Sequence, residues 1–399
     1  MKNIQKNYQR LLGKEYSVEY VFRPQEYGWA GDWEGRALLA FTCHYNMSGQ
    51  ENPSMHLLIE KLKEKTNAKM YLGKEFDGVT VDEQQISGHS WFLRGLIEYS
   101  IAFNSTFAKE VAKSTVENLY LPIAEWYERY PIDRNKIDGD VSGHSAERLN
   151  GWKLSTDVGC AFMCVDGLAH YFALTKDKKV KEFLDKVIGV FDSLDKVKLG
   201  FQTHTTLSCV RGILKLFETT GEEKYFNIAK RTFDEYLNCG MTLTYQNYNW
   251  YGRKDSWTEP CAVVDSFILA TEIYKITRIE KYLTVARRIW FNGLQFCQRN
   301  NGGAGTDSCA TKEFPFLKMN TYEAPFCCTM RYSEGLLEYL KNKELFGWDS
   351  NATEKIDQEG RRFVDDKLIV LLNGQKVPIF SCVDLDREQI EKVQLKIIF

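Results

Sequence analysis

Two short motifs, far apart in the chain, combine residue types that bind metal ions. The first is Trp257-Thr258-Glu259-Pro260-Cys261, and the second is the Cys327-Cys328 pair. Three thiolates and one carboxylate make a suitable tetrahedral shell for Zn²⁺. The spacing is not that of a zinc finger, because neither motif has the CxxC form. The two motifs together predict a Zn²⁺ site formed by Glu259, Cys261, Cys327 and Cys328.

Both motifs precede a segment with helical periodicity. Thr258 or Glu259 suits an N-cap, and Pro260 suits the first helical position. After the Cys-Cys pair, a helical stripe is formed by Met330, Ser333, Leu337 and Leu340. Helix N-termini favour thiolates and carboxylates through unpaired N–H groups and the helix dipole. Adjacent cysteines alone are more often unrelated core residues, so the hypothesis depends on the two motifs occurring together.

Other residues have the chemistry to bind a sugar. His89 and His204 each begin an apolar helix and are candidates for hydrogen bonds to hydroxyl groups, with a purely structural role as the alternative. Aromatic rings offer flat apolar faces with a polar edge, which suits stacking on a sugar ring. Core packing is the equal alternative for each of the aromatic candidates, which are Trp29, Trp33, Trp250, Tyr251 and Tyr322.

The elements that must position these residues are mainly helices. Between about residues 85 and 345 the apolar period is helical, and strand alternation is hard to find. Three segments, 168–191, 212–237 and 267–294, share a plan of helix, short turn and second helix. Helical hairpins stack because neither helix buries its apolar stripe alone. Their irregular spacing argues against a strict solenoid, so we predict a mainly α fold, an (α/α)6-type helical barrel.

The C-terminal part of the chain has a different pattern. From about Gly360 we predict short strands at Leu368–Leu372, Val377–Phe380 and Val393–Phe399, with an Asn-Gly turn after the first strand. We therefore predict two domains: an (α/α) barrel over residues 1–345 and a short β-rich tail over residues 346–399.

Composition limits the partners and the compartment. The net charge of −2 and the pI near 6.4 give no sign of nucleic acid or anionic membrane as a partner. No apolar run approaches the roughly 18 residues of a membrane span. The polar N-terminal stretch has no signal-peptide core, so we expect a cytoplasmic protein. In that compartment most of the 11 cysteines are expected to be free thiols.

The two motifs resemble those of the β-L-arabinofuranosidases with a cysteine nucleophile, glycoside hydrolase family 127. In that family a Glu-x-Cys motif opens one inner helix and a Cys-Cys pair opens another. The segments Gly28–Arg36 and Ser87–His89, together with His204, are also similar, so the resemblance covers most of residues 25–345.

The resemblance implies a catalytic site as well as a fold. It implies that the four predicted ligands surround zinc and that Cys327 attacks the anomeric carbon. A metal-held thiolate stays deprotonated at neutral pH, so its attack needs no separate base. Hydrolysis of the glycosyl-thioether would retain the anomeric configuration. The predicted substrate-binding residues are Trp29, Asp32, Trp33, His89, His204, Tyr251 and Tyr322.

The sequence departs from this family in its general acid. Family members carry an acid/base Glu shortly before the Glu-x-Cys motif, but residues 240–257 contain no Glu. Gln246 is the nearest isostere, and an amide cannot deliver a proton. Either another carboxyl group serves, or turnover is slow, specialised or lost. The carboxyl candidates are Glu34, Glu83, Asp255 and Glu323.

A second departure is length, because the family's relatives continue into complete β-sandwich domains. A homodimer is one way of supplying the missing wall of the pocket. The prediction is a retaining glycosidase for an L-arabinofuranoside or a similar plant-derived oligosaccharide, and the sugar follows from the resemblance alone. The alternatives are a zinc-containing sugar-binding protein without turnover, or another (α/α)-barrel enzyme such as an epimerase or a glycuronyl hydrolase.

Overall fold

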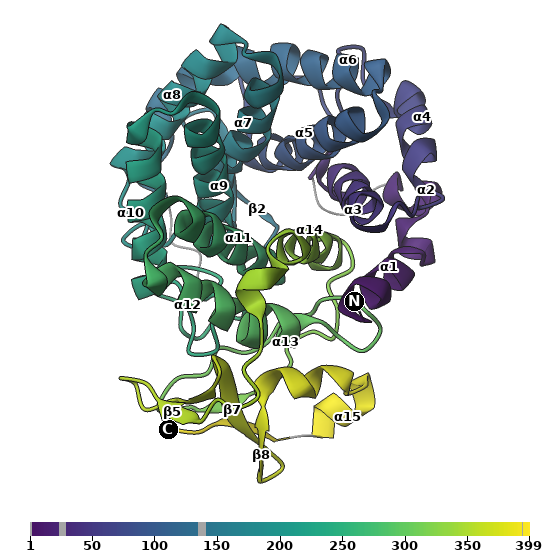
Figure 1. Ribbon diagram of the computed structural model, residues 1–399. Helices are drawn as coiled ribbons and strands as arrows, with labels where there is room; N and C mark the ends of the chain where they lie inside the picture. The colour runs from purple at the N-terminus through teal and green to yellow at the C-terminus, as the bar shows by residue number, and fades with distance from the viewer. Residues whose placement is uncertain (1, 24–28, 135–140, 393) are drawn as a thin grey trace. The chain divides into compact units, whose positions relative to one another are not determined.

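The computed structural model describes residues 2–23, 29–134, 141–392 and 394–399. Gly28 and Val393, which belong to two of the predicted segments, lie outside these ranges. The chain divides into two compact units. Unit 1 comprises Met1–Leu11 with Phe233–Phe399, and unit 2 comprises Leu12–Thr232. Helices dominate both units, so the predicted mainly α class is confirmed (Figure 1).

Unit 2 consists mainly of helices, together with one small sheet of three short strands. Its α-helices are α2 (Val18–Val21), α3 (Asp32–Ser48), α4 (Met55–Lys65), α5 (Glu83–Phe103), α6 (Thr106–Thr115), α7 (Cys164–Thr175), α8 (Lys178–Ser193) and α9 (Thr203–Thr220). Helices α3, α5, α7 and α9 pack on one another in that order. The three strands are β1 (Val81–Asp82), β2 (Ser145–Leu149) and β3 (Trp152–Ser155), in the order β1-β3-β2.

Glycines allow the buried helices of unit 2 to approach closely. A Cβ on Gly35 of α3 would lie 2.2 Å from the backbone of Trp91 in α5. A Cβ on Gly212 of α9 would lie 2.5 Å from the Val165 carbonyl in α7. Both distances are far inside van der Waals contact, so any larger residue would push the helices apart. Since α3, α5 and α9 carry predicted site residues, these contacts also set the spacing of those residues.

Unit 1 contains the remaining helices and a larger sheet. Its helices are α1 (Lys2–Leu11), α11 (Pro260–Thr277), α12 (Glu280–Arg288), α13 (Gln295–Cys297), α14 (Cys328–Lys341) and α15 (Arg387–Lys392), while α10 (Glu223–Cys239) runs across the division between the units. The predicted hairpins correspond to α7–α8, α9–α10 and α11–α12, and all three are confirmed.

The sheet of unit 1 consists of strands from the tail (Figure 1) and of one strand, β4, that comes earlier in the chain. Its strands are β4 (Phe316–Leu317), β5 (Glu354–Ile356), β6 (Arg362–Val364), β7 (Lys367–Leu372), β8 (Gln375–Pro378) and β9 (Leu395–Ile397). Their order is β4-β9-β7-β6-β5, with β8 paired to β7. The predicted Asn-Gly turn joins β7 to β8, with positive φ at Asn373 (49°) and Gly374 (86°), as a two-residue hairpin requires.

Two expectations about strands are corrected. Residues 85–345 do contain strands, namely β2, β3 and β4. The strands of the tail begin at Glu354 rather than near Gly360, and the strand predicted at Val377–Phe380 ends at Pro378, where a 3₁₀ helix (Ile379–Asp384) follows. The expectation of free thiols is confirmed for all the cysteines, each of which lies in the described part of the chain. The division into domains after residue 345 stays a prediction.

Candidate metal centre

The first candidate metal motif lies at the start of α11, as predicted. Glu259 is the N-cap, with an extended backbone (φ −124°, ψ 111°), and Pro260 is the first helical residue. The Glu259 N–H donates to Asn247 Oδ1 at 2.8 Å. Cys261 follows within the first turn and is fully buried. The ligand atoms of Glu259 and Cys261 lie within 4.8 Å of each other.

The second motif lies at the start of α14 and meets the first. Cys327 is the N-cap and Cys328 the first helical residue. The Sγ atom of Cys328 is 3.6 Å from that of Cys261 and 3.3 Å from that of Cys327. Sulfur ligands of a tetrahedral zinc with Zn–S bonds of about 2.3 Å are separated by ~3.8 Å. Both measured sulfur–sulfur distances are close to this value, as one shared zinc ion would require, and the Glu259 carboxylate, within 4.8 Å of the Cys261 sulfur, is the candidate fourth donor.

The cluster is closed on one side and open on the other. Cys261 and Cys328 are buried, whereas Glu259 and Cys327 are partly exposed. Burial raises the pKa of the Cys328 thiol well above its ordinary value, and hydrogen bonds and charge repulsion from Cys261 and Cys327 raise it further. A cation reverses this preference, because it stabilises thiolates outright. Cys327 is the sulfur with access to a ligand from solvent.

A buried ion pair joins the two helices behind the cluster. Arg331 of α14 pairs with Asp265 of α11, and both side chains are fully buried. Arg331 also pairs with Glu334 one turn further along α14. Each residue lies about one turn beyond its own cysteine motif, so the pair fixes the separation of the two helix starts.

A second buried network lies on the loops that precede α11 and α14. Asp307 accepts from Arg299 Nη2 and from Gln246 Nε2, each at 2.8 Å. Burial raises the pKa of the Asp307 carboxyl, and the Arg299 charge opposes this shift. Thr244 donates to Gln246 Oε1 at 2.7 Å. Both ends of the Gln246 amide are therefore used within the protein.

Asp307 and Arg299 were missed by the sequence analysis. They lie in a stretch with three glycines, Gly302, Gly303 and Gly305, which indicated only a loop. A Cβ at Gly303 would lie 2.4 Å from the Glu323 carboxyl carbon, and one at Gly305 would lie 2.3 Å from the Tyr322 carbonyl oxygen. Close approach of two chain segments is therefore the reason for glycine at Gly303 and Gly305, and this was the available signal.

Glu323, an acid/base candidate, lies in an ion pair. Arg10 of α1 donates to its carboxylate at 2.8 Å, and Thr329 Oγ1 donates at 2.9 Å. The neighbouring Tyr322 is partly exposed and accepts from Arg299 Nε through its carbonyl oxygen at 3.0 Å. Arg10 and Thr329 connect the segment before the Cys-Cys pair to α1 and α14.

The remaining predicted residues of unit 1 are mostly buried. Tyr251 is 2% exposed. Trp250 packs edge-on against Trp257 with ring centroids 5.3 Å apart. Asp255 is exposed, and hydrogen bonding to Arg253 lowers the pKa of its carboxyl. An Asp with a lowered pKa is a poor proton donor at neutral pH.

In unit 2 the structure brings Asp32 and His204 into one cluster. Asp32 accepts from Arg36 Nε at 2.9 Å within α3. The Arg36 guanidinium lies 4.3 Å from the ring centroid of Trp91 on α5. The same indole stacks on His204 of α9, with centroids 5.9 Å apart and planes 16° apart. A carboxylate, a cation and two flat rings from three helices thus form one contiguous buried group, which we call the α3–α5–α9 cluster.

His89 was expected to begin a helix, but it lies in the second turn of α5, which begins at Glu83. Its Nδ1 lies 2.8 Å from the Gln85 carbonyl oxygen, so it carries the proton, and its Nε2 accepts from the Leu72 N–H at 3.2 Å. Burial lowers its pKa to about 4, so the ring is neutral at physiological pH. Both nitrogens of His89 bond to backbone groups and hold the 67–74 loop on α5.

The N-terminal aromatic segment is largely buried as well. Trp29 is 9% exposed and donates from Nε1 to the Gly143 carbonyl at 3.0 Å. Trp33 is 4% exposed and packs edge-on against Tyr20. These indoles contribute to packing, and their proposed stacking on a sugar stays a prediction.

Two carboxyl candidates of unit 2 differ in their surroundings. Glu34, in the first turn of α3, has its pKa raised to about 7, mainly by burial and also by the Asp32 charge. Glu83 is fully buried and accepts from Tyr130 Oη and from the Ser155 N–H, each at 2.6 Å, beside Arg134. Glu83 therefore holds α5 to β3, while Glu34 has the protonation behaviour of an acid at neutral pH.

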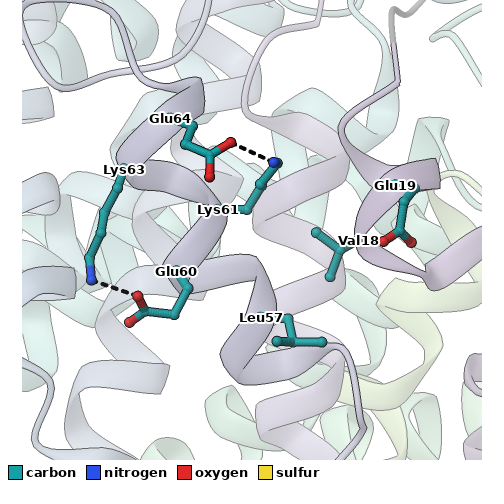
Figure 2. A pocket seen from close by; sticks show the side chains of 7 residues that line it. All are labelled: Val18, Glu19, Leu57, Glu60, Lys61, Lys63 and Glu64. Atoms are coloured by element: carbon teal, nitrogen blue, oxygen red, sulfur yellow. Dashed lines mark hydrogen bonds and ion pairs between the residues drawn. The ribbon is translucent and has the colours of Figure 1, made fainter.

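A shallow groove on unit 2 is lined by none of the predicted site residues. It lies between α2 and α4 and has a volume of about 330 Å³. Figure 2 shows two ion pairs among its charged residues, Lys61 with Glu64 and Lys63 with Glu60. Among the described helices, none combines the length and apolar character needed to cross a membrane.

No protein-family model matches the sequence, and no curated protein matches it. Among solved structures, the cellobiose 2-epimerase from Bacillus thermoamylovorans has a TM-score of 0.55 at 14% identity, over 85% of this chain and 99% of that chain. A sugar epimerase from a ruminal bacterium has a TM-score of 0.57 at 12% identity, over 87% and 99%. A GH127 β-arabinofuranosidase has a TM-score of 0.57 at 12% identity, over 93% of this chain and 62% of its own length. At these identities the likeness shows the fold, and the predicted (α/α)-barrel class is confirmed.

Proposed function

We propose that this chain is a retaining glycoside hydrolase with a cysteine nucleophile, acting on an L-arabinofuranoside or a similar plant-derived oligosaccharide. The observation that carries the proposal is the convergence of three cysteine sulfurs at the starts of α11 and α14, with the Glu259 carboxylate within 4.8 Å of the Cys261 sulfur. Glu259, Cys261, Cys327 and Cys328 would hold Zn²⁺. When bound, the ion would supply the positive charge that keeps the thiols deprotonated near neutral pH.

In this proposal Cys327 attacks the anomeric carbon, since it is the cysteine of the pair that reaches solvent. The carbon–oxygen bond to the leaving group breaks, and that oxygen takes a proton from a carboxylic acid. Water then cleaves the thioether and releases the sugar with its configuration retained. Of the acid candidates, Glu34 has a pKa near neutrality, whereas Glu83 and Glu323 are engaged by arginines. Gln246 is fixed between Thr244 and Asp307.

The first test measures zinc in the wild type and in Cys328→Ser by elemental analysis, with a panel of aryl furanosides and pyranosides assayed in parallel. Cys382→Ser is the matched control, because it removes a buried thiol of unit 1 that belongs to neither motif. We expect about one zinc per chain in the wild type and control, its loss in Cys328→Ser, and no turnover by Cys327→Ala. The proposal would be contradicted if reduced wild-type protein contained no zinc, or if it released no sugar from any substrate of the panel.

A second candidate function is sugar epimerisation. The observation that favours it is the likeness to two epimerases, each covered over 99% of its length. Such a reaction needs His or Asp pairs rather than thiolates as its proton-transfer groups, and His204 lies with Asp32 in the α3–α5–α9 cluster. Conversion of a disaccharide that survives Cys327→Ala but not His204→Ala would select this function over hydrolysis. Sugar binding by calorimetry without any conversion would select a binding protein.

A further inference from the structure

Asp307 is a buried carboxylate with no place in the proposed chemistry. Its side chain is 0% exposed, and each oxygen has a strong donor: Arg299 Nη2 on Oδ1 and Gln246 Nε2 on Oδ2, both at 2.8 Å. Arg299 is 1% exposed and also donates to the carbonyl oxygens of Phe296 and Tyr322. A pair so deeply buried requires full hydrogen bonding, and Asp307 and Arg299 both receive it.

This pair is joined by its backbone to the first metal motif. The Thr258 N–H donates to the Asp307 carbonyl at 2.8 Å, and the Asp307 N–H donates to Thr258 Oγ1 at 2.9 Å. Trp257 and Ser308, which adjoin them, form an isolated β-bridge. Two reciprocal hydrogen bonds therefore fix the peptide directly before Glu259.

The Gln246 side of the network reaches Glu259 by another path. The residue after Gln246 is Asn247, whose Oδ1 accepts the Glu259 N–H at 2.8 Å. Gln246 is itself fixed by Asp307 and by Thr244. Glu259 is thus held from Asn247 on one side and from Thr258 on the other, and Asp307 is common to both paths.

We propose that Asp307 is a positioning residue for the metal ligand Glu259, acting through Gln246 and Thr258; this inference rests on the proposed function of Glu259 as a zinc ligand. It also gives a reason for an amide at Gln246. The Asp307 carboxylate needs a donor at that point, and a glutamate there would place two carboxylates together in a site from which water is excluded. Gln246 is therefore a structural partner of Asp307.

The test measures zinc affinity by competition with a chromophoric chelator, on the full-length protein at a temperature where each variant is folded. Asp307→Asn keeps the shape but loses the charge and one acceptor, and we expect affinity to fall about 10- to 100-fold, as for other residues that orient a metal ligand. Asp234→Asn is the matched control, because Asp234 accepts from Tyr282 and Lys281 and joins α10 to α12. It should lower the Tm and leave zinc affinity unchanged.

Two further variants separate positioning from general destabilisation. Gln246→Leu removes the donor to Asp307 while keeping its volume, and it should also weaken zinc binding; it replaces Asp307→Asn as the test if that variant does not fold. Gln246→Glu combined with Asp307→Asn exchanges acid and amide, and it should restore most of the affinity lost in Asp307→Asn.

The outcomes distinguish this inference from the proposed function. The positioning role alone would be overturned if the wild type bound zinc and folded Asp307→Asn and Gln246→Leu bound it with the same affinity. A fall in affinity in Asp234→Asn as large as in Asp307→Asn would also overturn it. Absence of zinc from the wild type would overturn both.

Discussion

Glu34 makes the stability of the protein depend on pH. Its pKa is about 7 in the folded protein against an ordinary value of 4.5, because burial disfavours the charged form. Between these values the folded protein holds a proton that the unfolded chain has lost, so stability falls as pH rises through this window. Glu34→Gln removes the titration. We expect the fall in Tm between about pH 5 and pH 8 to be smaller in this variant than in the wild type.

A matched control is Glu182→Gln, since Glu182 is an exposed glutamate of α8. It should show the pH dependence of the wild type. An unchanged slope in Glu34→Gln would mean that Glu34 is ionised in the folded protein at neutral pH, and its protonation behaviour would then no longer favour it as the general acid.

The sequence pointed to the two cysteine motifs, whose metal binding stays a prediction, and missed the buried residues around them. Glu259, Cys261 and the Cys-Cys pair are recognisable because their types are few and their positions precede helical stripes. Asp307 is an ordinary loop residue until its burial is known, and burial depends on contacts with Arg299 and Gln246, the latter 61 residues away. Motifs defined by residue type can be found in the sequence, whereas the burial of Asp307 depends on contacts that no local pattern displays.

Between elements, the Asp265–Arg331 pair holds α11 against α14. Removing Asp265 takes away the charge on α11 that pairs with buried Arg331 and leaves Arg331 paired with Glu334 of its own helix, so the cost is at most the about 3–5 kcal/mol of a broken buried ion pair. We expect Asp265→Ala to lower the free energy of unfolding by up to this amount, measured by urea denaturation. Exposed Asp255→Ala, on the loop before α11, should change it by less than about 0.5 kcal/mol. Equal effects of the two variants would contradict the assignment of this pair as the link between the helices.

Two glutamates, Glu272 and Glu338, lie close together in the C-terminal halves of α11 and α14. Burial, with repulsion from Glu272 of α11, raises the pKa of Glu338 of α14 to about 7. The proton favoured by the folded state is lost as pH rises through 7, so the contact destabilises the protein at higher pH. Glu338→Gln should raise the unfolding free energy at pH 8 by ~1 kcal/mol, a value reduced because solvent screens this partly exposed charge. At pH 5 the substitution should have little effect. Equal effects at both pH values would exclude titration as the cause.

Helices and strands differed in how far sequence predicted them. The outer helix α8 buries Val180, Phe183, Leu184 and Val187 on one face, a local pattern that sequence displays directly. Strand β2 has the sequence SAERL and is mostly exposed, so it shows no apolar alternation. Strand β4 has two residues and exists because it pairs with β9, whose partner residue Lys396 lies 80 positions from Phe316. Such pairing is non-local, and no short window contains it.

Over the whole chain, the hairpin repeat was enough to predict the barrel class, but it did not predict the two compact units. The N-terminal helix α1 belongs to unit 1, where Asn7 donates to the Gly302 and Thr329 carbonyls, each at 3.1 Å, and accepts from Ser333 Oγ at 2.8 Å. Contacts across some 300 residues leave no trace in local periodicity. The sequence therefore indicated which elements form and not which ones form a unit.

Residues 346–399, which follow the predicted domain boundary, make hydrogen bonds and ion pairs with the rest of unit 1. Buried Asn292 donates to the Asp366 carbonyl at 2.8 Å and accepts from the Leu368 N–H at 2.7 Å. Arg287 pairs with Asp365 and Asp366 at 2.8 and 2.7 Å. Truncation after residue 345 would remove these partners together with the apolar residues of β7 and β9.

We therefore expect the chain 1–345 to unfold without a cooperative transition or at a much lower Tm, measured by circular dichroism and calorimetry. Deletion of residues 398–399 alone is the control, since it leaves β9 intact and should leave the Tm near that of the wild type. Cooperative unfolding of 1–345 near the wild-type Tm, with zinc bound, would establish it as an independent domain. The expected loss would instead assign the tail a structural role in the unit that contains both cysteine motifs, because β9 pairs with β4 in the loop between Asp307 and Cys327.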